Sequence, residues 1–222
     1  MNSCLSALHV AEMGTMERPV NNSKGCGGGM RVAPVGLIVD DPKEAFNLGC
    51  EVAAITHGHP SGYLASGALA AIIHIIKTGG ELSETIDAAI RLLEQHRDHQ
   101  ECVDAIAQAV DLAVDGNPKA ESIQQMGEGW VAEEALAISL YCALCAENDF
   151  KKGVLMAVNH SGDSDSTGAI TGNILGCLMG NSSIPGEWIE QLELKEIIKQ
   201  LGVDLFIQFR NDRQGWGQYP GW

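Results

Sequence analysis

The 222-residue chain is short of basic residues. Lysine and arginine together number 14, against 29 aspartate and glutamate residues, which gives a formal net charge of −15 at pH 7. Non-specific binding to nucleic acids or to anionic membranes requires a basic surface, so the composition argues against both kinds of partner. A small phosphate-bearing ligand is compatible with this charge, because backbone N–H groups or bound cations can hold a phosphate.

The chain also lacks a long apolar run, a recognisable signal peptide and a paired set of cysteines. No apolar stretch approaches the ~18 residues that a membrane-spanning helix requires. The seven cysteines are odd in number and scattered along the sequence. Cys142 and Cys145 form a Cys-x-x-Cys, but their Ala/Leu-rich surroundings favour two thiols of a helical core over a redox pair. We therefore expect a protein of a reducing cytoplasm, with no membrane segment.

Hydrophobic periodicity indicates helices along almost the whole chain. The hydrophobic content of 45% and charged content of 19% are those of a folded globular protein. The predicted helices cover residues 41–56, 60–78, 82–97, 101–114, 130–146, 149–158, 165–180 and 192–200. Only residues 31–39 and 203–209 are short apolar runs without helical spacing. We predict an all-α fold, with one compact domain over residues 1–222.

The segment NHSGDSDSTG, residues 159–168, is the most informative stretch. It places the carboxylates of Asp163 and Asp165 and the hydroxyl of Ser166 at the start of a predicted helix, and hard oxygen ligands on a rigid element are what magnesium or calcium requires. The alternative is an ordinary helix cap, which Asp and Ser also favour. A cap uses one such residue, whereas four acidic or hydroxyl residues run from 163 to 166. Spacing alone leaves both interpretations open.

Glycines follow at positions 168, 172, 176 and 180, so they share one face of the predicted helix. Each interior glycine costs about 1 kcal/mol relative to alanine, so four in register require a reason. We expect that they let another backbone approach closely, which would bury the helix and its acidic first turn.

Two further motifs could bind a ligand. The segment NNSKGCGGGMR, residues 21–31, has four glycines within five residues, which can turn sharply and present N–H groups to a phosphate; a flexible loop is the alternative. The segment THGHP holds His57 and His59, and no further Cys or His lies at zinc-finger spacing, so hydrogen-bond donation to a ligand is favoured over zinc binding. A purely structural histidine is the alternative here. His160 could orient a ligand or support a neighbouring residue.

Trp130 stands at the end of the turn GEGW, residues 127–130, just before a predicted helix. An indole in this place could stack on a nucleobase, or it could fill the core under a loop. Both interpretations stay open.

Together these segments resemble the ADP-ribosylglycohydrolase family. The resemblance is carried, in consistent order along the chain, by NNSKGCGGGMRVAP (21–34), THGHP (56–60), GEGWVAEEAL (127–136), HSGDSDSTGAITGNILG (160–176) and IPGEWIEQLE (184–193). It implies an all-α, orthogonal multi-helix bundle that binds two Mg²⁺ ions. It also implies cleavage of the glycosidic bond between ADP-ribose and a modified protein side chain or a small molecule.

The resemblance also implies site residues. Asp163 and Asp165 would be catalytic as ligands of the metal, together with Ser166. The implied substrate-binding residues are Ser23, Gly25, Cys26, Gly27, Gly28, His57, His59 and Trp130. The family's Gly-Asp helix start and Thr-Asp-Asp motif, which supply the other metal ligands, are absent from this chain. Two carboxylates and a hydroxyl cannot satisfy two six-coordinate ions.

We therefore expect the C-terminal part of the family fold, N-terminally incomplete. It would act as a glycohydrolase, whole or as a fragment completed by an N-terminal partner chain. Lost helices would leave apolar surface bare, which predicts self-association. One alternative is an inert ADP-ribose-binding protein that kept the glycine loop. Another is a helical scaffold without a ligand.

Overall fold

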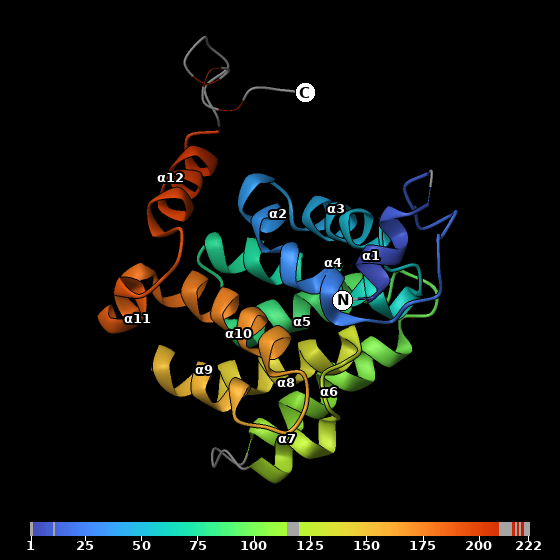
Figure 1. Ribbon diagram of the computed structural model, residues 1–222. Coiled ribbons are helices and arrows are strands. Elements are labelled where there is room, and N and C mark those ends of the chain that lie inside the picture. Colours follow the sequence, from blue (N-terminus) through green and yellow to red (C-terminus); the bar gives the residue numbers. More distant parts are fainter. Residues whose placement is uncertain are drawn as a thin grey trace. The chain divides into compact units, whose positions relative to one another are not determined.

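The computed structural model describes residues 2–10, 12–114 and 120–208, and the single residues 215, 217 and 219. The chain divides into two compact units, Met1–Ser183 and Ile184–Trp222. The described residues form helices and no strand, apart from one isolated bridge (Figure 1). The all-α prediction is thus confirmed, whereas the single domain over residues 1–222 stays a prediction.

The centre of the first unit is α4, Pro60–Lys77, an 18-residue helix. It starts with proline, is apolar on nearly all sides, and ends where Gly79 takes a φ of 97°. Gly67 lets it lie close to α3, Pro42–Ala54, because a Cβ at Gly67 would be 2.7 Å from the carbonyl oxygen of Phe46. The other helices that contact α4 include α2 (Ala33–Ile38), α5 (Leu82–Leu93), α8 (Ala132–Leu144) and α10 (Ser164–Met179).

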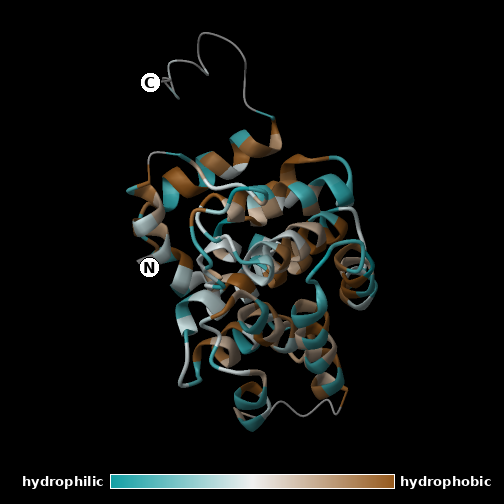
Figure 2. Ribbon diagram, turned by 90° about the vertical axis from the view of Figure 1, so that its right-hand side faces the viewer, coloured by the Kyte–Doolittle hydropathy of each residue, from teal (hydrophilic) through white to brown (hydrophobic). Residues whose placement is uncertain are grey.

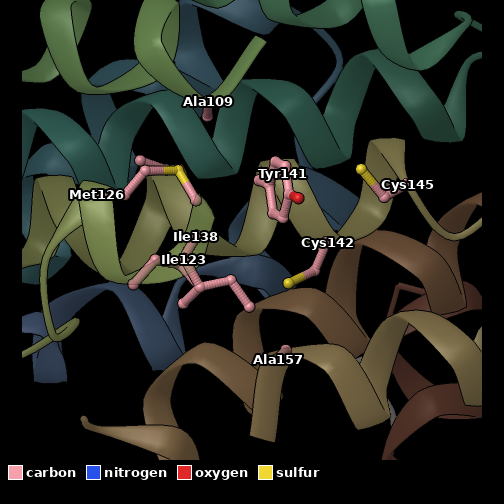
Figure 3. Close-up of a cluster of buried hydrophobic side chains, with 9 residues drawn as sticks. Ala109, Ile123, Met126, Ile138, Tyr141, Cys142, Cys145 and Ala157 are labelled. Carbon is pink, nitrogen blue, oxygen red and sulfur yellow. The ribbon is translucent and has the colours of Figure 1, made fainter. Parts of the chain in front are cut away.

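A second layer of the first unit is organised around α8. This helix packs against α10 and also against α6 (Gln100–Ala113), α7 (Ala120–Met126) and α9 (Phe150–Val158). Figure 3 shows Tyr141 and Cys142 of α8, and Cys145 directly after it, among apolar side chains of α6, α7 and α9. All seven cysteines are free thiols, and Cys142 and Cys145 are buried, which confirms that they are core residues. The helices alternate between hydrophobic and hydrophilic segments, as amphipathic helices around a core do (Figure 2).

The structure adds several short helices that periodicity did not predict. Residues 31–39 are not a run without helical structure, because the 3₁₀ helix η1 (Cys26–Arg31) leads directly into α2. The helix predicted over 192–200 is α12 (Lys195–Phe206) of the second unit, and it continues through residues 203–206. The remaining additions are α1 (Asn2–Leu8), α7, η2 (Asn181–Ser183) and α11 (Gly186–Glu190). None of the helices within the described ranges is long and apolar enough to cross a membrane.

The expected close packing along the glycine face of α10 is wrong for three of the four glycines. A Cβ added at Gly168 would press on the Val158 side chain, but one added at Gly172 or Gly180 would meet no atom within 4 Å. At Gly176 the nearest atom is 4.0 Å away, on the Phe150 ring. Within the described structure this face of α10 is therefore open beyond its first turn. The acidic turn is held instead by the loop beside it.

Candidate functional site

Asp163 is the N-cap of α10, and its side chain is buried within the first unit. The Asp163 N–H donates to the carbonyl oxygen of Glu128 at 2.7 Å, and the Ser166 hydroxyl donates to Oδ2 of Asp163 at 3.0 Å. Asp165 lies in the first turn of the helix and is exposed. The helix-cap interpretation of this segment is therefore confirmed for Asp163. The carboxylate of Asp165 and the Oδ2 atom of Asp163 take no part in this cap.

The glycine loop meets this acidic turn. The thiol of Cys26 lies 2.9 Å from Oδ2 of Asp163 and 3.1 Å from Oγ of Ser166, although these residues are more than a hundred positions apart in the sequence. Two motifs that the sequence marked separately thus form one site. Asp163 and Ser166 therefore face the glycine loop at Cys26, whereas Asp165 is exposed.

The carboxyl groups of Asp163 and Asp165 interact and shift each other's pKa in opposite directions. Burial acts to raise the pKa of Asp163, but hydrogen bonds from Asp165, Cys26 and Ser166 outweigh it and lower the pKa below its ordinary value. The same hydrogen bond, and the charge of Asp163, raise the pKa of Asp165. Burial, and then the neighbouring Asp163, raise the pKa of Cys26 to about 12. Cys26 is therefore a protonated donor to Asp163 at neutral pH, not a thiolate nucleophile.

The loop is fixed by the segment around Trp130. Gly25 and Val131 form an antiparallel bridge, the Cys26 N–H donates to the Trp130 carbonyl at 3.3 Å, and the Ala132 N–H donates to the Lys24 carbonyl at 2.8 Å. Because the Cys26 N–H is used within the protein, any binding of phosphate by this loop would fall to the glycines after it. These contacts argue against the alternative that residues 21–31 form a flexible loop.

Four charged residues that sequence reasoning missed hold this arrangement. Lys24 Nζ lies 2.8 Å from Oε2 of Glu101 and 2.5 Å from Oε1 of Glu133, which ties the loop to α6 and α8. The carboxylate of Glu134 accepts hydrogen bonds from the N–H groups of Glu128, at 3.1 Å, and Gly129, at 3.0 Å. Glu133 and Glu134 could have been identified from the sequence, because two adjacent acidic residues stand in the first turn of the helix predicted after Trp130.

The motif histidines differ in their surroundings. His57 is only 2% exposed, and its ring edge lies against Gly25 and Gly27. His59 caps α4, with Nδ1 accepting from the Ser61 N–H at 3.2 Å. The His160 ring bridges the Gly162 N–H and the Thr167 hydroxyl, so it supports the acidic loop. Of the three, only His57 places its ring against the glycines of the loop, whereas His59 contacts the loop through its N–H, which donates to the Ser23 carbonyl at 3.3 Å.

The remaining predicted residues border the same site. Trp130 is 58% exposed and donates from Nε1 to Oε2 of Glu128, so it does not fill the core. The Ser23 hydroxyl lies 3.2 Å from the Gly25 N–H and accepts from it. Gly28 is buried, and a Cβ there would be 2.9 Å from Cβ of Ala53, so its first role is to let the loop pack on α3.

The chain is similar in sequence and in fold to known proteins. The sequence profile of the family described as ADP-ribosylglycohydrolase matches residues 1–215. The chain belongs to the ADP-ribosylglycohydrolase family. A solved structure titled "ADP-ribosylglycohydrolase-related protein complex" is 29% identical, with a TM-score of 0.64 over 83% of this chain and 60% of that one.

Three differently named hydrolases are among the curated relatives of this chain. ADP-ribosylarginine hydrolase Tri1 of Pseudomonas putida (strain GB-1) is 28% identical, over 69% of this chain and 38% of its own length. ADP-ribosyl-(dinitrogen reductase) glycohydrolase of Rhodospirillum rubrum is 26% identical, over 87% and 60%. ADP-ribosylhydrolase ARH3 of Bos taurus is 25% identical, over 85% and 59%. The chain thus spans 38% to 60% of the length of these relatives.

The oxygen ligands in this site are of the type that a hard cation prefers, but they are too few to complete its coordination sphere. Asp163, Asp165 and Ser166 offer carboxylate and hydroxyl oxygens, which Mg²⁺ and Ca²⁺ prefer. No group of three or more His, Cys, Asp or Glu side chains arranged to hold a metal ion occurs among the described residues. A complete coordination sphere therefore needs water, substrate or further protein ligands.

Proposed function

We propose that this chain takes part in Mg²⁺-dependent hydrolysis of the glycosidic bond between ADP-ribose and a protein side chain or small molecule. The observation that carries the proposal is the meeting of the glycine loop with the acidic turn, at Cys26, Asp163 and Ser166. Family membership and the names of the hydrolase relatives support the same reaction.

In this proposal Asp163, Asp165 and Ser166 hold the metal. Bound Mg²⁺ would supply Lewis acidity and a template for the hydroxyl groups of the distal ribose. Hydrogen bonds from Cys26 and Ser166 keep Asp163 ionised and fix its orientation, so it acts as a ligand and not as a general acid. Cys26 stays protonated throughout and contributes no nucleophile.

The substrate would lie along the glycine loop. Ser23, Gly25, Cys26, Gly27 and Gly28 would border the diphosphate and ribose, with His57 as a neutral donor and His59 at the edge. The exposed Trp130 adjoins Cys26 through the hydrogen bond between their main chains, and its indole face is available to adenine. Fixing both ends of ADP-ribose would hold the glycosidic carbon near Asp163.

The short ligand set leads to a second proposal about partners. Because the described residues supply two carboxylates, the remaining ligands would come from a longer form of the chain or from a partner chain, in a cytoplasmic setting. The same shortage favours the alternative function, an ADP-ribose-binding protein without turnover.

The test measures hydrolysis of ADP-ribosyl-arginine and the binding of Mg²⁺ and of ADP-ribose. We expect Asp163→Asn and Asp165→Ala to weaken Mg²⁺ binding about tenfold or more and to abolish turnover, as loss of a charged ligand should. Asp149→Asn is the matched control, because Asp149 is likewise an N-cap, of α9, and asparagine preserves a cap.

Two outcomes decide between the functions. Turnover that needs Mg²⁺ and disappears in Asp165→Ala supports the hydrolase. Retained ADP-ribose affinity without turnover supports the binding protein. Equal Mg²⁺ affinity in Asp165→Ala, Asp163→Asn and the unchanged protein would show that the metal assignment is wrong.

A further inference from the structure

A chain of side chains leads from the end of the glycine loop to His57. Nη2 of Arg31 lies 2.7 Å from Oγ1 of Thr56 and 2.7 Å from the carbonyl oxygen of Val52, near the end of α3. Oγ1 of Thr56 lies 2.8 Å from Nδ1 of His57. Thr56 is 5% exposed and His57 is 2% exposed, so water competes little for these groups.

The direction of each hydrogen bond follows from what each group can donate. A guanidinium group has donors and no acceptor, so Arg31 must donate to the Thr56 oxygen. The single hydroxyl proton of Thr56 is then free to point at His57, and Nδ1 is the acceptor that the described residues offer it. An Nδ1 that accepts carries no proton in neutral imidazole, so the proton is on Nε2.

The Nε2–H group faces the glycine loop. A Cβ at Gly25 would be 3.2 Å from Nε2, and one at Gly27 would be 3.4 Å from it. Within the described part of the chain, no hydrogen bond is formed by Nε2. Burial, and then the charge of Arg31, lower the pKa of His57 to about 4, so the ring is neutral near pH 7. Because this N–H group has no acceptor among the described residues, it can donate a hydrogen bond to an acceptor from outside the protein.

We infer that Arg31 and Thr56 are positioning residues that hold His57 as an Nε2–H donor for a diphosphate oxygen at the glycine loop. The identity of this ligand rests on the function proposed above. Diphosphate oxygens only accept hydrogen bonds. The other tautomer would turn a lone pair towards them and repel them.

The tautomer can be read by long-range ¹H–¹⁵N correlation spectra of the full ¹⁵N-labelled chain at pH 7. We expect a protonated Nε2 and an unprotonated Nδ1 at His57 in the unchanged protein. Thr56→Val removes the hydroxyl at nearly constant volume and should give a mixture of tautomers. Thr56→Ser keeps the hydroxyl and should keep the spectrum. These signals report directly which ring nitrogen of His57 carries the proton. A loss of packing alone would therefore not change the tautomer in Thr56→Val while leaving it unchanged in Thr56→Ser.

Thr171→Val is the matched control. The Thr171 hydroxyl is buried and has no hydrogen-bond partner among the residues that the structure describes, so its removal should leave the His57 signals unchanged. In calorimetric titrations with ADP-ribose, Thr56→Val should bind about tenfold more weakly, while Thr56→Ser and Thr171→Val stay within about twofold of the unchanged protein.

A protonated Nδ1 in the unchanged protein overturns the inference, and this result does not depend on whether any variant folds. A Thr56→Val spectrum and affinity equal to those of the unchanged protein overturn it as well. If the unchanged protein shows the Nε2–H form but does not bind ADP-ribose, the proposed function fails while the assigned tautomer is supported.

Discussion

Lowering the pH from 7 to 5 should destabilise the chain in part through His57. Burial, and then the charge of Arg31, place its pKa at about 4, against 6.5 for an ordinary histidine. Between these values the unfolded chain binds a proton that the folded chain excludes. The stability contributed by neutral His57 is therefore fully present above pH 6.5 and is lost as the pH falls towards 4.

The size of the effect follows from the two pKa values. One pKa unit corresponds to 1.36 kcal/mol, and most of the interval from pH 7 to pH 5 lies where only the unfolded chain is protonated. His57 should therefore account for a loss of about 2 kcal/mol in the free energy of unfolding over this interval. Other groups titrate in the same range, so the effect must be isolated by substitution.

The assay is urea unfolding of the unchanged protein and of His57→Gln at both pH values. Glutamine does not titrate, and any cost of the substitution that is independent of pH cancels between the two conditions. The unchanged protein should lose about 2 kcal/mol more than His57→Gln. Equal losses in the two proteins would refute the argument that His57 is kept neutral by its surroundings.

Three further predictions concern glycine and charge. Gly172→Ala should stabilise the chain by about 0.5–1 kcal/mol in thermal unfolding, because the position is helical and open; destabilisation would mean that something covers this face. Gly162→Ala should cost roughly 3 kcal/mol and weaken Mg²⁺ binding, because its Cβ would overlap the Glu128 carbonyl oxygen that holds Asp163; unfolding equal to that of the unchanged protein would contradict this. Lys24→Met should cost about 1–3 kcal/mol in urea unfolding, because it leaves the buried Glu133 carboxylate without its cation; adding Glu133→Gln should recover most of the loss.

The fold could be predicted wherever a helix was long enough to show its period. The central helix was visible from its starting proline, its apolar length and its closing glycines. The six residues of α2 were missed, because fewer than two turns do not establish a period and because the Gly-rich stretch before them suggested a loop. Short helices of this kind are stabilised by tertiary packing, which a local pattern does not contain.

Local patterns indicated the parts of the site, whereas the expectation that these parts form one site came from the family resemblance. Asp163 and Ser166 were found because hydroxyl and acidic residues clustered at one helix start. That Cys26 would donate to Asp163 depends on how η1 packs against α10, and no spacing in the sequence encodes this packing. The close packing predicted along the glycine face of α10 was wrong for a related reason. Small residues allow another backbone to approach, but they do not require one to be there.

The contact between Cys26 and Asp163 also bears on biosynthesis. A chain grows from its N-terminus at about 5–20 residues per second, and early segments can fold before later ones exist. The glycine loop is made well before its partners at positions 130, 131, 132, 163 and 166. A ribosome-bound nascent chain therefore has no complete candidate site until Ser166 has been made, so a ligand that needs the whole site cannot assist the folding of the earlier helices before then.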